Sequence, residues 1–189
     1  SPSYLILQSL DKANRNLNDY PAKMCRMIPK INALKNKLCK HGYLLYGDEA
    51  LKLTICSKPY GYTGNQMAEL LRKMNIEPEF ADPDYLVMMM SVEADEETLM
   101  HIEEALCKIP RQEPIADLSP VFVLPEKVMT ARQAILACAE LLPTDKCNGR
   151  VLAQATVACP PAVPVLVCGE KIDAHAIECF NYYGIDSCF

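Results

Sequence analysis

The segment that decides the fold runs from Leu51 to Ser91 and reads LKLTICSKPYGYTGNQMAELLRKMNIEPEFADPDYLVMMMS. Its first six residues alternate apolar and polar side chains, which is typical of a strand with one wet face. Thr63 and Gln66 have the capping-box spacing, so we expect a helix to begin there. Asp82-Pro83-Asp84 predicts a turn. The almost continuous apolar run Tyr85–Val92 then predicts a strand covered on both sides.

A short extended piece and a second helix complete this unit. Residues 76–81 are extended between the first helix and the turn, and Asp95 is the expected N-cap of a helix that ends before Pro110. Apolar side chains recur at helical spacing, so they predict the buried stripes of the two helices: Met67, Leu70, Leu71 and Met74 in the first, and Leu99, Ile102, Leu106 and Ile109 in the second. The pattern is that of a β-α-β-β-α unit with helices packed on a sheet.

Two helices are expected ahead of this unit. Ser1-Pro2 resembles an N-cap with proline at the first helical position, and Asn18 to Pro21 should interrupt the helix. The second helix should reach His41 and end at Gly42, with a kink at Pro29. Their predicted buried sides are Tyr4, Leu7, Leu10, Ala13 and Leu17 in the first helix, and Met24, Met27, Ile28, Ile31, Leu34 and Leu38 in the second.

The last third of the chain predicts a second, smaller module. After a connector over residues 111–120, residues 121–124 should be extended, and Thr130 with Gln133 should cap a helix that Pro143 ends. The inward side chains of that helix are expected to be Ala131, Ala134, Ile135 and Cys138. Residues 150–158 and 163–167 predict two strands on either side of Pro160-Pro161, and Asp173 should cap a final helix that ends near Gly184.

The fold class predicted from these patterns is α/β (α+β). Residues 1–47 are expected to form linking helices, residues 48–112 the small β-α-β-β-α domain, and residues 113–189 a C-terminal α+β module.

Composition excludes several classes of protein. The 189 residues carry a net charge of −5, so there is no basic footprint for nucleic acid. No apolar run is long enough to span a membrane. The ten cysteines include no C-x-x-C pair and no secretion signal precedes them, so we expect reduced thiols that serve mostly as small hydrophobes in a cytoplasmic protein, and no metal site.

Few residues offer chemistry by spacing alone. Gly61 to Gly64 could present free N–H groups to an anion, although a turn followed by a helix cap explains the same residues. Arg132 and Arg150 lie beside predicted element boundaries, where a guanidinium could hold a carboxylate or phosphate or could form a structural ion pair. No histidine is spaced to activate a serine or cysteine. The acidic run from Glu93 to Glu104 is expected to be a solvated helix face.

Six motifs in order give the chain a family resemblance: SPSYLILQSLD, LKLTI, GYTGNQMAELL, EFADPDYLVMMMS, TARQA and GRVLAQATVACPPAVPVLVCGE. Together they resemble the C-terminal portion of the ornithine/lysine/arginine decarboxylases, which are pyridoxal-phosphate enzymes of the aspartate-aminotransferase-like fold. The family usually has Tyr-Pro-Pro-Gly where this chain has Cys159-Pro160-Pro161-Ala162. It usually has Arg-Glu-Ala where this chain has Arg132-Gln133-Ala134.

The resemblance implies a role and a limit. Similar enzymes lose CO₂ from a basic amino acid and yield a polyamine precursor, using a lysine in a Ser-x-His-Lys motif that would lie before Ser1. No His-Lys dipeptide occurs in this chain, so we expect it to contain no catalytic residue, to bind no cofactor alone and to be inactive alone. The resemblance suggests Ser1 for contact with the cofactor phosphate. It suggests Arg132, Arg150 and Glu170 for the active-site mouth or an interface.

The expected partners are the pyridoxal-phosphate-binding large domain of the same enzyme and further copies in a homo-oligomer. Two alternatives belong to other functional classes. A β-α-β-β-α unit can bind amino acids as a regulatory module, and the two leading helices could expose apolar faces that make the chain an oligomerisation piece.

Overall fold

The computed structural model describes residues 3–154 and 164–189, in which the chain divides into two compact units. The N-terminal unit contains the residues up to Ala81 and Tyr85–Ile115, and the C-terminal unit contains Asp82–Asp84 and Ala116–Phe189. The predicted cap at Ser1-Pro2 and the proline pair at Pro160-Pro161 lie outside the described residues. The mixed α/β class predicted from sequence is confirmed.

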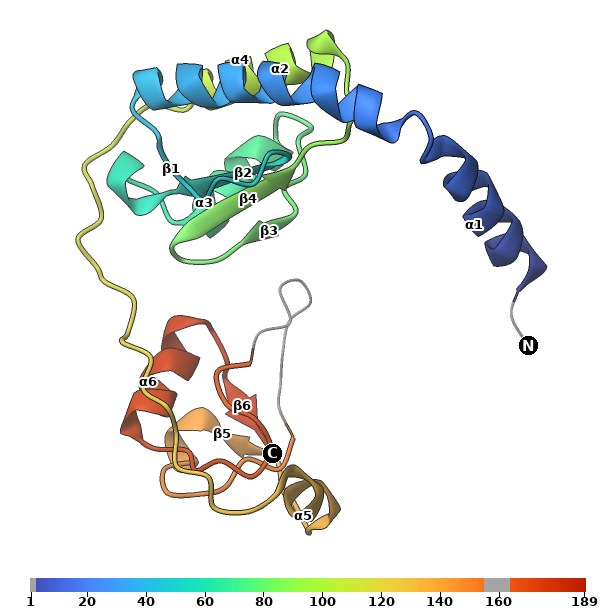
Figure 1. Cartoon of the computed structure of the whole chain (residues 1–189). Coiled ribbons are helices and arrows are strands. Elements are labelled where there is room, and N and C mark those ends of the chain that lie inside the picture. Colours follow the sequence, from blue (N-terminus) through green and yellow to red (C-terminus); the bar gives the residue numbers. More distant parts are fainter. Residues whose placement is uncertain (1–2, 155–163) are drawn as a thin grey trace. The chain divides into compact units, whose positions relative to one another are not determined.

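A four-stranded antiparallel sheet forms the centre of the N-terminal unit (Figure 1). Its strands are β1 (Leu44–Tyr46), β2 (Lys52–Cys56), β3 (Phe80–Ala81) and β4 (Tyr85–Met89), in the order β1-β2-β4-β3. The strand β1 was not predicted, because its three residues are too few to show a period. It pairs with β2 from Leu44 opposite Cys56 to Tyr46 opposite Thr54.

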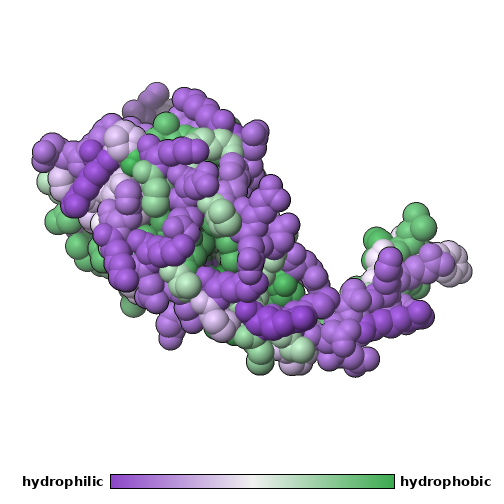
Figure 2. Space-filling model, turned by 90° about the horizontal axis from the view of Figure 1, so that it is seen from above, coloured by the Kyte–Doolittle hydropathy of each residue, from purple (hydrophilic) through white to green (hydrophobic). Residues whose placement is uncertain are grey.

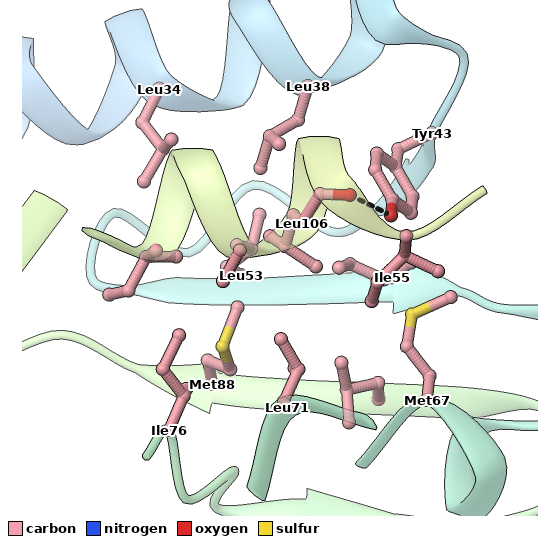
Figure 3. Packing of buried hydrophobic residues seen from close by; sticks show 14 of the residues in the cluster. Leu34, Leu38, Tyr43, Leu53, Ile55, Met67, Leu71, Ile76, Met88 and Leu106 are labelled. Carbon is pink, nitrogen blue, oxygen red and sulfur yellow. Dashed lines mark hydrogen bonds between the residues drawn. The ribbon is translucent and has the colours of Figure 1, made fainter. Parts of the chain in front are cut away.

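One face of the sheet carries the core. Opposite one another in the register are Leu53 and Met88, and Ile55 and Leu86, and each of the four is at most 4% exposed. They form a single cluster with side chains of α2 (Tyr20–His41), α3 (Gly64–Arg72) and α4 (Glu96–Lys108). Figure 3 shows this packing, with Leu34, Leu38 and Leu106 from the helices directed at the sheet residues.

The other face of the sheet is not covered by these helices. Tyr85 and Val87 are only half-buried, Met89 is 57% exposed, and on β1 the side chain of Tyr46 is 68% exposed. The prediction that Tyr85–Val92 is a strand covered on both sides is therefore wrong. Its apolar run places alternate residues on an open face, and regular structure ends at Met89.

The predicted starts of α3 and α4 and the predicted end of α2 are confirmed. Thr63 and Gln66 form a reciprocal capping box at the start of α3. The Asp95 carboxylate accepts the Thr98 N–H at 2.8 Å, and the hydrogen bonds from Thr98 lower the pKa of Asp95. Gly42 ends α2 at φ +107°, a conformation that glycine adopts without steric cost.

Four of the six residues predicted to be buried in α2 are buried: Met27, Ile31, Leu34 and Leu38. Met24 and Ile28 are half-buried.

Ion pairs join α2 to the acidic run on and before α4. Lysines seven residues apart along α2 face three glutamates at 2.5 to 2.9 Å, in the pairs Lys23–Glu93, Lys30–Glu96 and Lys37–Glu103. The acidic run is thus more than a solvated face, because the spacing of two helical turns aligns a row of cations along it. At least one side chain of each pair is more than 60% exposed, so each pair adds little to stability.

Tyrosines satisfy carbonyls at the carboxyl end of α4, where a helix leaves oxygens without intrahelical donors. Three hydroxyls donate to three carbonyl oxygens, at 2.8, 3.2 and 2.7 Å: Tyr43 to Leu106, Tyr60 to Ile109, and Tyr62 to Pro110. Tyr60 is the last residue of the 3-10 turn η1 (Lys58–Tyr60), and Tyr62 follows shortly after it. Their hydrogen bonds therefore fix the loop after β2 to the end of α4.

The first helix, α1 (Tyr4–Asn16), buries none of its side chains. Every residue from 3 to 22 is exposed, including Tyr4 at 82% and Leu10 at 56%, so the predicted buried side of this helix is wrong within the described chain. Figure 2 shows hydrophobic atoms on α1 and a mainly hydrophilic outer surface over α2 and α4. The break predicted between the two helices is confirmed, since α1 ends at Asn16 and α2 begins at Tyr20.

The C-terminal unit has little regular structure. Its elements are α5 (Ala131–Leu136), β5 (Leu142–Pro143), the 3-10 turn η2 (Thr144–Lys146), α6 (Ala174–Tyr182) and β6 (Ser187–Cys188). The strands β5 and β6 pair with each other. The core is small, and its buried residues are Cys147, Leu152, Leu166, Ile172, Ala176, Phe180 and Cys188.

Several predictions for this unit are wrong. Residues 121–124 form no strand and are all at least 48% exposed. The helix capped by Thr130 ends at Leu136, well before Pro143. Of the four residues predicted to face inward only Ala134 is buried, whereas Ala131, Ile135 and Cys138 are exposed. The predicted strands are not formed where the structure describes them: Val151 makes one isolated bridge to Lys171, and residues 164–167 form none. The cap at Asp173 is confirmed.

Candidate functional site

Three short segments of the C-terminal unit meet around the residues singled out from the sequence. Lys127 bridges Glu170, and Val151 bridges Lys171. The Leu152 N–H donates to the Glu170 carbonyl at 2.9 Å. The structure thus places the backbones of Arg150 and Glu170 on neighbouring paired segments, although nineteen residues separate them in sequence.

Gly169 allows the closest of these approaches. Its φ is +91°, and a β-carbon there would lie 2.3 Å from the carbonyl oxygen of Met129. Val128 and Met129 both donate their N–H groups to the Gly169 carbonyl. Only glycine combines this backbone conformation with this proximity, so the segment before α5 packs directly on the Gly169-Glu170 turn.

Arg150 forms an ion pair at the edge of a cavity. Its Nη2 lies 2.5 Å from Glu140 Oε1, and the two side chains are 52% and 59% exposed. The cavity has a volume of about 210 Å³ and is lined mostly by apolar and sulfur-bearing side chains, with Arg150 and Glu140 as its charged members. The structural ion pair weighed for Arg150 in the sequence is therefore present, and the guanidinium keeps donors for a further anion.

Glu170 and Arg132 do not line this cavity. The Glu170 carboxylate accepts the Val167 N–H at 2.7 Å, and the Glu170 N–H donates to the Val167 carbonyl at 3.2 Å, so this side chain closes its own turn. Arg132 lies exposed on α5, and among the described residues its guanidinium makes no ion pair. Ser1 lies outside the described residues.

The Gly61–Gly64 loop is built as a turn and a cap. The Gly61 N–H donates to Lys58, the Tyr62 N–H to Ser57, and the Gln66 N–H to the Thr63 side chain. A β-carbon at Gly61 would lie 2.6 Å from Gln112, so this side of the turn is filled by protein. The geometry favours the structural interpretation over the anion site.

His101 and His41 have structural surroundings. His101 Nε2 lies 2.9 Å from the Met74 carbonyl, and the His41 ring stacks 6.1 Å from that of Tyr43. Within residues 3–154 and 164–189, no group of three or more histidine, cysteine or acidic side chains is arranged to hold a metal ion. In the same residues no helix has the length and hydropathy of a bilayer span.

A pair of thiols lies in direct contact in the C-terminal unit without any signal in the sequence. Cys147 and Cys188 are both 2% exposed, and their sulfur atoms are 3.2 Å apart. Of the nine described cysteines four are exposed, so the expectation that the thiols serve mostly as small hydrophobes is only partly met. No local spacing signals this pair, since 40 residues separate the two positions and only the β5–β6 pairing brings them together.

The described residues do not fit a pyridoxal-phosphate site of their own. Such a site needs a lysine for the aldehyde and donors for the phosphate in one pocket. No lysine lines the cavity beside Arg150. Lys52 lines an open groove on the uncovered face of the sheet, where its Nζ is paired with Glu49 at 2.7 Å.

Comparison with known proteins finds a family match within the C-terminal unit. Residues 118–185 match the family described as "Orn/Lys/Arg decarboxylase, C-terminal domain". Over these residues the chain is similar to that C-terminal domain. The match covers most of the C-terminal unit. It includes α5, α6 and the three candidate site residues Arg132, Arg150 and Glu170.

Relatives of the decarboxylase family extend the similarity over nearly the whole chain. An arginine decarboxylase of Bacillus subtilis is 29% identical over 198 residues, covering 94% of this chain and 40% of its own length. An arginine decarboxylase of Halalkalibacterium halodurans is 30% identical over 192 residues, covering 91% of this chain and 39% of its own length. The chain thus spans about two fifths of the length of the curated relatives it matches.

Solved structures show the same fold at lower identity. The constitutive lysine decarboxylase of Escherichia coli aligns with a TM-score of 0.52 and 19% identity, over 74% of this chain and 29% of its own. A lysine decarboxylase of Francisella novicida aligns with a TM-score of 0.53 and 15% identity, over 76% of this chain and 30% of its own. Both alignments extend beyond the family match, so they include part of the N-terminal unit.

Proposed function

We propose that this chain supplies the small sheet domain and C-terminal module of a pyridoxal-phosphate-dependent decarboxylase of a basic amino acid. The observation that carries the proposal is the similarity to arginine decarboxylases over more than nine tenths of the chain. Arginine is therefore the first substrate to test, ahead of lysine and ornithine. The product would be a polyamine precursor, and the enzyme is expected in the cytoplasm.

The catalytic lysine and the cofactor belong to another part of the enzyme in this proposal. No His-Lys dipeptide occurs in the 189 residues, and the described residues build no cofactor pocket. The chain would instead close over a cofactor held by the large domain. Pyridoxal phosphate supplies the electron sink for loss of CO₂ when it is bound there.

Exposed apolar surface supports an interface with that domain or with another subunit. The side chains of α1 are unburied, and Leu44, Tyr46 and Met89 on the open face of the sheet are each at least 54% exposed. Such patches are typical of surfaces that a partner covers. We propose the large domain as the first partner and a homo-oligomer as the complete assembly.

Arg150 is the candidate for the active-site mouth that the geometry favours, because it lies at a cavity and retains donors beyond its pair with Glu140. Arg132 is a candidate for contact with a partner because its guanidinium is exposed. Glu170 would act by holding the turn beside Arg150. Ser1 remains the candidate for the cofactor phosphate.

The test begins with the complete reading frame that contains this chain. Its product is purified with pyridoxal phosphate, and release of CO₂ from carboxyl-labelled arginine, lysine and ornithine is measured. We expect a Ser-x-His-Lys motif upstream of Ser1 and turnover of one of the three amino acids. A folded full-length product that decarboxylates none of them would refute the proposal.

Substitutions in that product separate the roles. Arg150→Ala should raise KM or lower kcat severalfold. Arg72→Ala is the matched control, since Arg72 is an exposed arginine on α3 that is ion-paired with Glu77 at 2.9 Å. Equal activity of both variants would remove Arg150 from the active-site mouth while leaving the decarboxylase assignment to the first experiment.

A further inference from the structure

Two cysteines of the C-terminal unit hold their sulfur atoms in direct contact. Cys147 follows the turn η2, and Cys188 lies in β6, the strand that pairs with β5. Their Sγ atoms are 3.2 Å apart, and both residues belong to the small core of the unit. Two folded elements thus position the two thiols toward each other.

The thiol protons are ordered along a chain of acceptors. The Cys188 thiol donates to Cys147 Sγ, and Cys147 Sγ lies 3.3 Å from the Pro143 carbonyl oxygen, to which it donates in turn. Burial, and then the contact with Cys147, raises the pKa of Cys188 to about 12. Cys188 therefore keeps its proton at neutral pH. In the hydrogen bond between the two thiols, Cys188 is the donor and Cys147 is the acceptor.

Both cysteines line a cavity of the C-terminal unit. The cavity of about 210 Å³ is lined by Cys147 and Cys188 together with the exposed Cys138 and with Arg150 at its edge. A volume of this size admits a molecule larger than water. A small oxidant that enters this cavity can therefore approach the pair while the unit stays folded. Cysteines in a core without a cavity would be reached only after unfolding.

We propose that Cys147 and Cys188 are a redox modification site that a hydroperoxide converts reversibly into a disulfide. Cys147 sulfur attacks one peroxide oxygen, the O–O bond breaks, and the thiol proton leaves with the other oxygen as water or alcohol. Cys188 sulfur then attacks the sulfenic sulfur of Cys147, the S–OH bond breaks, and the hydroxide departs with the Cys188 proton as water. Two thiols lose two electrons and one peroxide gains them. A dithiol reductant reverses the step by thiol–disulfide exchange.

The disulfide would tie the penultimate residue of the chain to the end of η2. Between the two positions lies α6, whose residues Ala176 and Phe180 belong to the same core. Oxidation would therefore hold β6 and α6 on the unit, and reduction would release that constraint. This inference does not depend on the decarboxylase proposal.

The test maps disulfides in the whole chain under native conditions. The protein is treated with hydrogen peroxide, remaining thiols are alkylated, and trypsin is added without reductant. Cleavage at Lys146, Arg150 and Lys171 gives the peptides 147–150 and 172–189. We expect these two peptides joined, with a mass lower by two hydrogen atoms, and fragment ions that assign the bond to Cys188 rather than Cys179.

Controls make either result decisive. Cys188→Ser should abolish the linked peptide, whereas Cys138→Ser, which changes an exposed thiol of the same cavity, should leave it. If Cys188→Ser does not fold, wild-type protein oxidised in urea serves instead, because pairing among ten cysteines should reduce the yield of this link severalfold. Alkylation of Cys147 and Cys188 at a peroxide dose that oxidises Cys138 would overturn the proposal, as would a link that dithiothreitol does not reduce.

Discussion

Replacing Tyr43 by phenylalanine should remove one hydrogen bond and little else. The side chain is 3% exposed, and its hydroxyl donates to the Leu106 carbonyl at 2.8 Å at the end of α4. That carbonyl also accepts the Ile109 N–H at 3.2 Å, so it is not left without a donor. We therefore expect a loss near the centre of the range for a single hydrogen bond, about 1 kcal/mol in the free energy of unfolding.

The alkaline pH range gives this prediction a second arm. Burial, and then the neighbouring Tyr60, raises the pKa of Tyr43, so its phenol stays protonated in the folded chain after it ionises in the unfolded chain. The folded state then binds more protons, so stability from this group is complete below about pH 10 and is lost as the pH rises further. At pH 11 the wild type should lose about 1.4 kcal/mol that the phenylalanine variant cannot lose.

Urea unfolding followed by far-ultraviolet circular dichroism measures the difference, since the long helices of the N-terminal unit dominate that signal. The gap between wild type and Tyr43→Phe should be about 1 kcal/mol at neutral pH and should close or reverse near pH 11. Tyr46→Phe is the control, because Tyr46 is 68% exposed. A gap that stays constant with pH, or an equal loss in Tyr46→Phe, would refute the reasoning.

Three further changes test the packing. Leu106→Ala, at a fully buried residue, should lower the free energy of unfolding in urea by about 2–5 kcal/mol. Leu118→Ala, at a residue that is 86% exposed, should change it by less than about 0.5 kcal/mol. Gly169→Ala should destabilise the C-terminal unit more than Gly149→Ala does, because an added β-carbon would lie 2.3 Å from a backbone oxygen at Gly169 and would meet no atom within 4 Å at Gly149. Limited proteolysis compares the two variants, and equal cleavage rates would contradict the contact. Deletion of α1 should leave the unfolding midpoint of the N-terminal unit unchanged, since α1 buries no side chain, and a clear drop in the midpoint would contradict this.

Where local chemistry decides structure, the sequence was sufficient. The capping box of Thr63 and Gln66 and the Asp95 cap each fix a helix start by a bond between residues three apart, so the pattern and its cause lie in the same few positions. Gly42 marks a helix end for the same reason. The buried stripe of α4 follows from its period, and all of its predicted members are buried.

Coverage of the sheet could not be predicted from composition. Tyr85, Val87 and Met89 are as apolar as the buried residues between them, so the run itself does not reveal that only alternate residues meet helices. Likewise the apolar face of α1 has the helical period of a packed element without anything packed on it. In both cases the apolar pattern shows that the surface would gain free energy from burial. The pattern does not show which other element or molecule covers that surface.

The candidate site was predictable only in part, because it depends on long-range backbone pairing. Arg150 and Glu170 were chosen for their side chains, and the structure joins their segments by backbone hydrogen bonds. Their contacts differ, because Arg150 pairs with Glu140 whereas Glu170 accepts the Val167 N–H. No spacing rule in the sequence predicts the pairing of Arg150 with Glu140 or that of Glu170 with the Val167 N–H. The strands β5 and β6 have two residues each, too few for a period, so the contact of Cys147 with Cys188 was equally hidden.

The weak core of the C-terminal unit is the reason that a disulfide there would have a large effect. Among the described residues, a core cluster of only seven buried side chains and strands of two residues leave this unit little apolar stabilisation. On the chain-entropy account, a bond that closes a loop of about forty residues lowers the entropy of the unfolded unit enough to stabilise it by roughly 4 kcal/mol. That is a large share of the stability of a small unit. Peroxide-treated protein should therefore resist proteolysis of residues after Ala116 markedly better than the dithiothreitol-treated protein, with little change in the N-terminal unit. Equal proteolysis of both forms, once the linked peptide has been verified, would mean that β6 and α6 are already held as firmly without the bond.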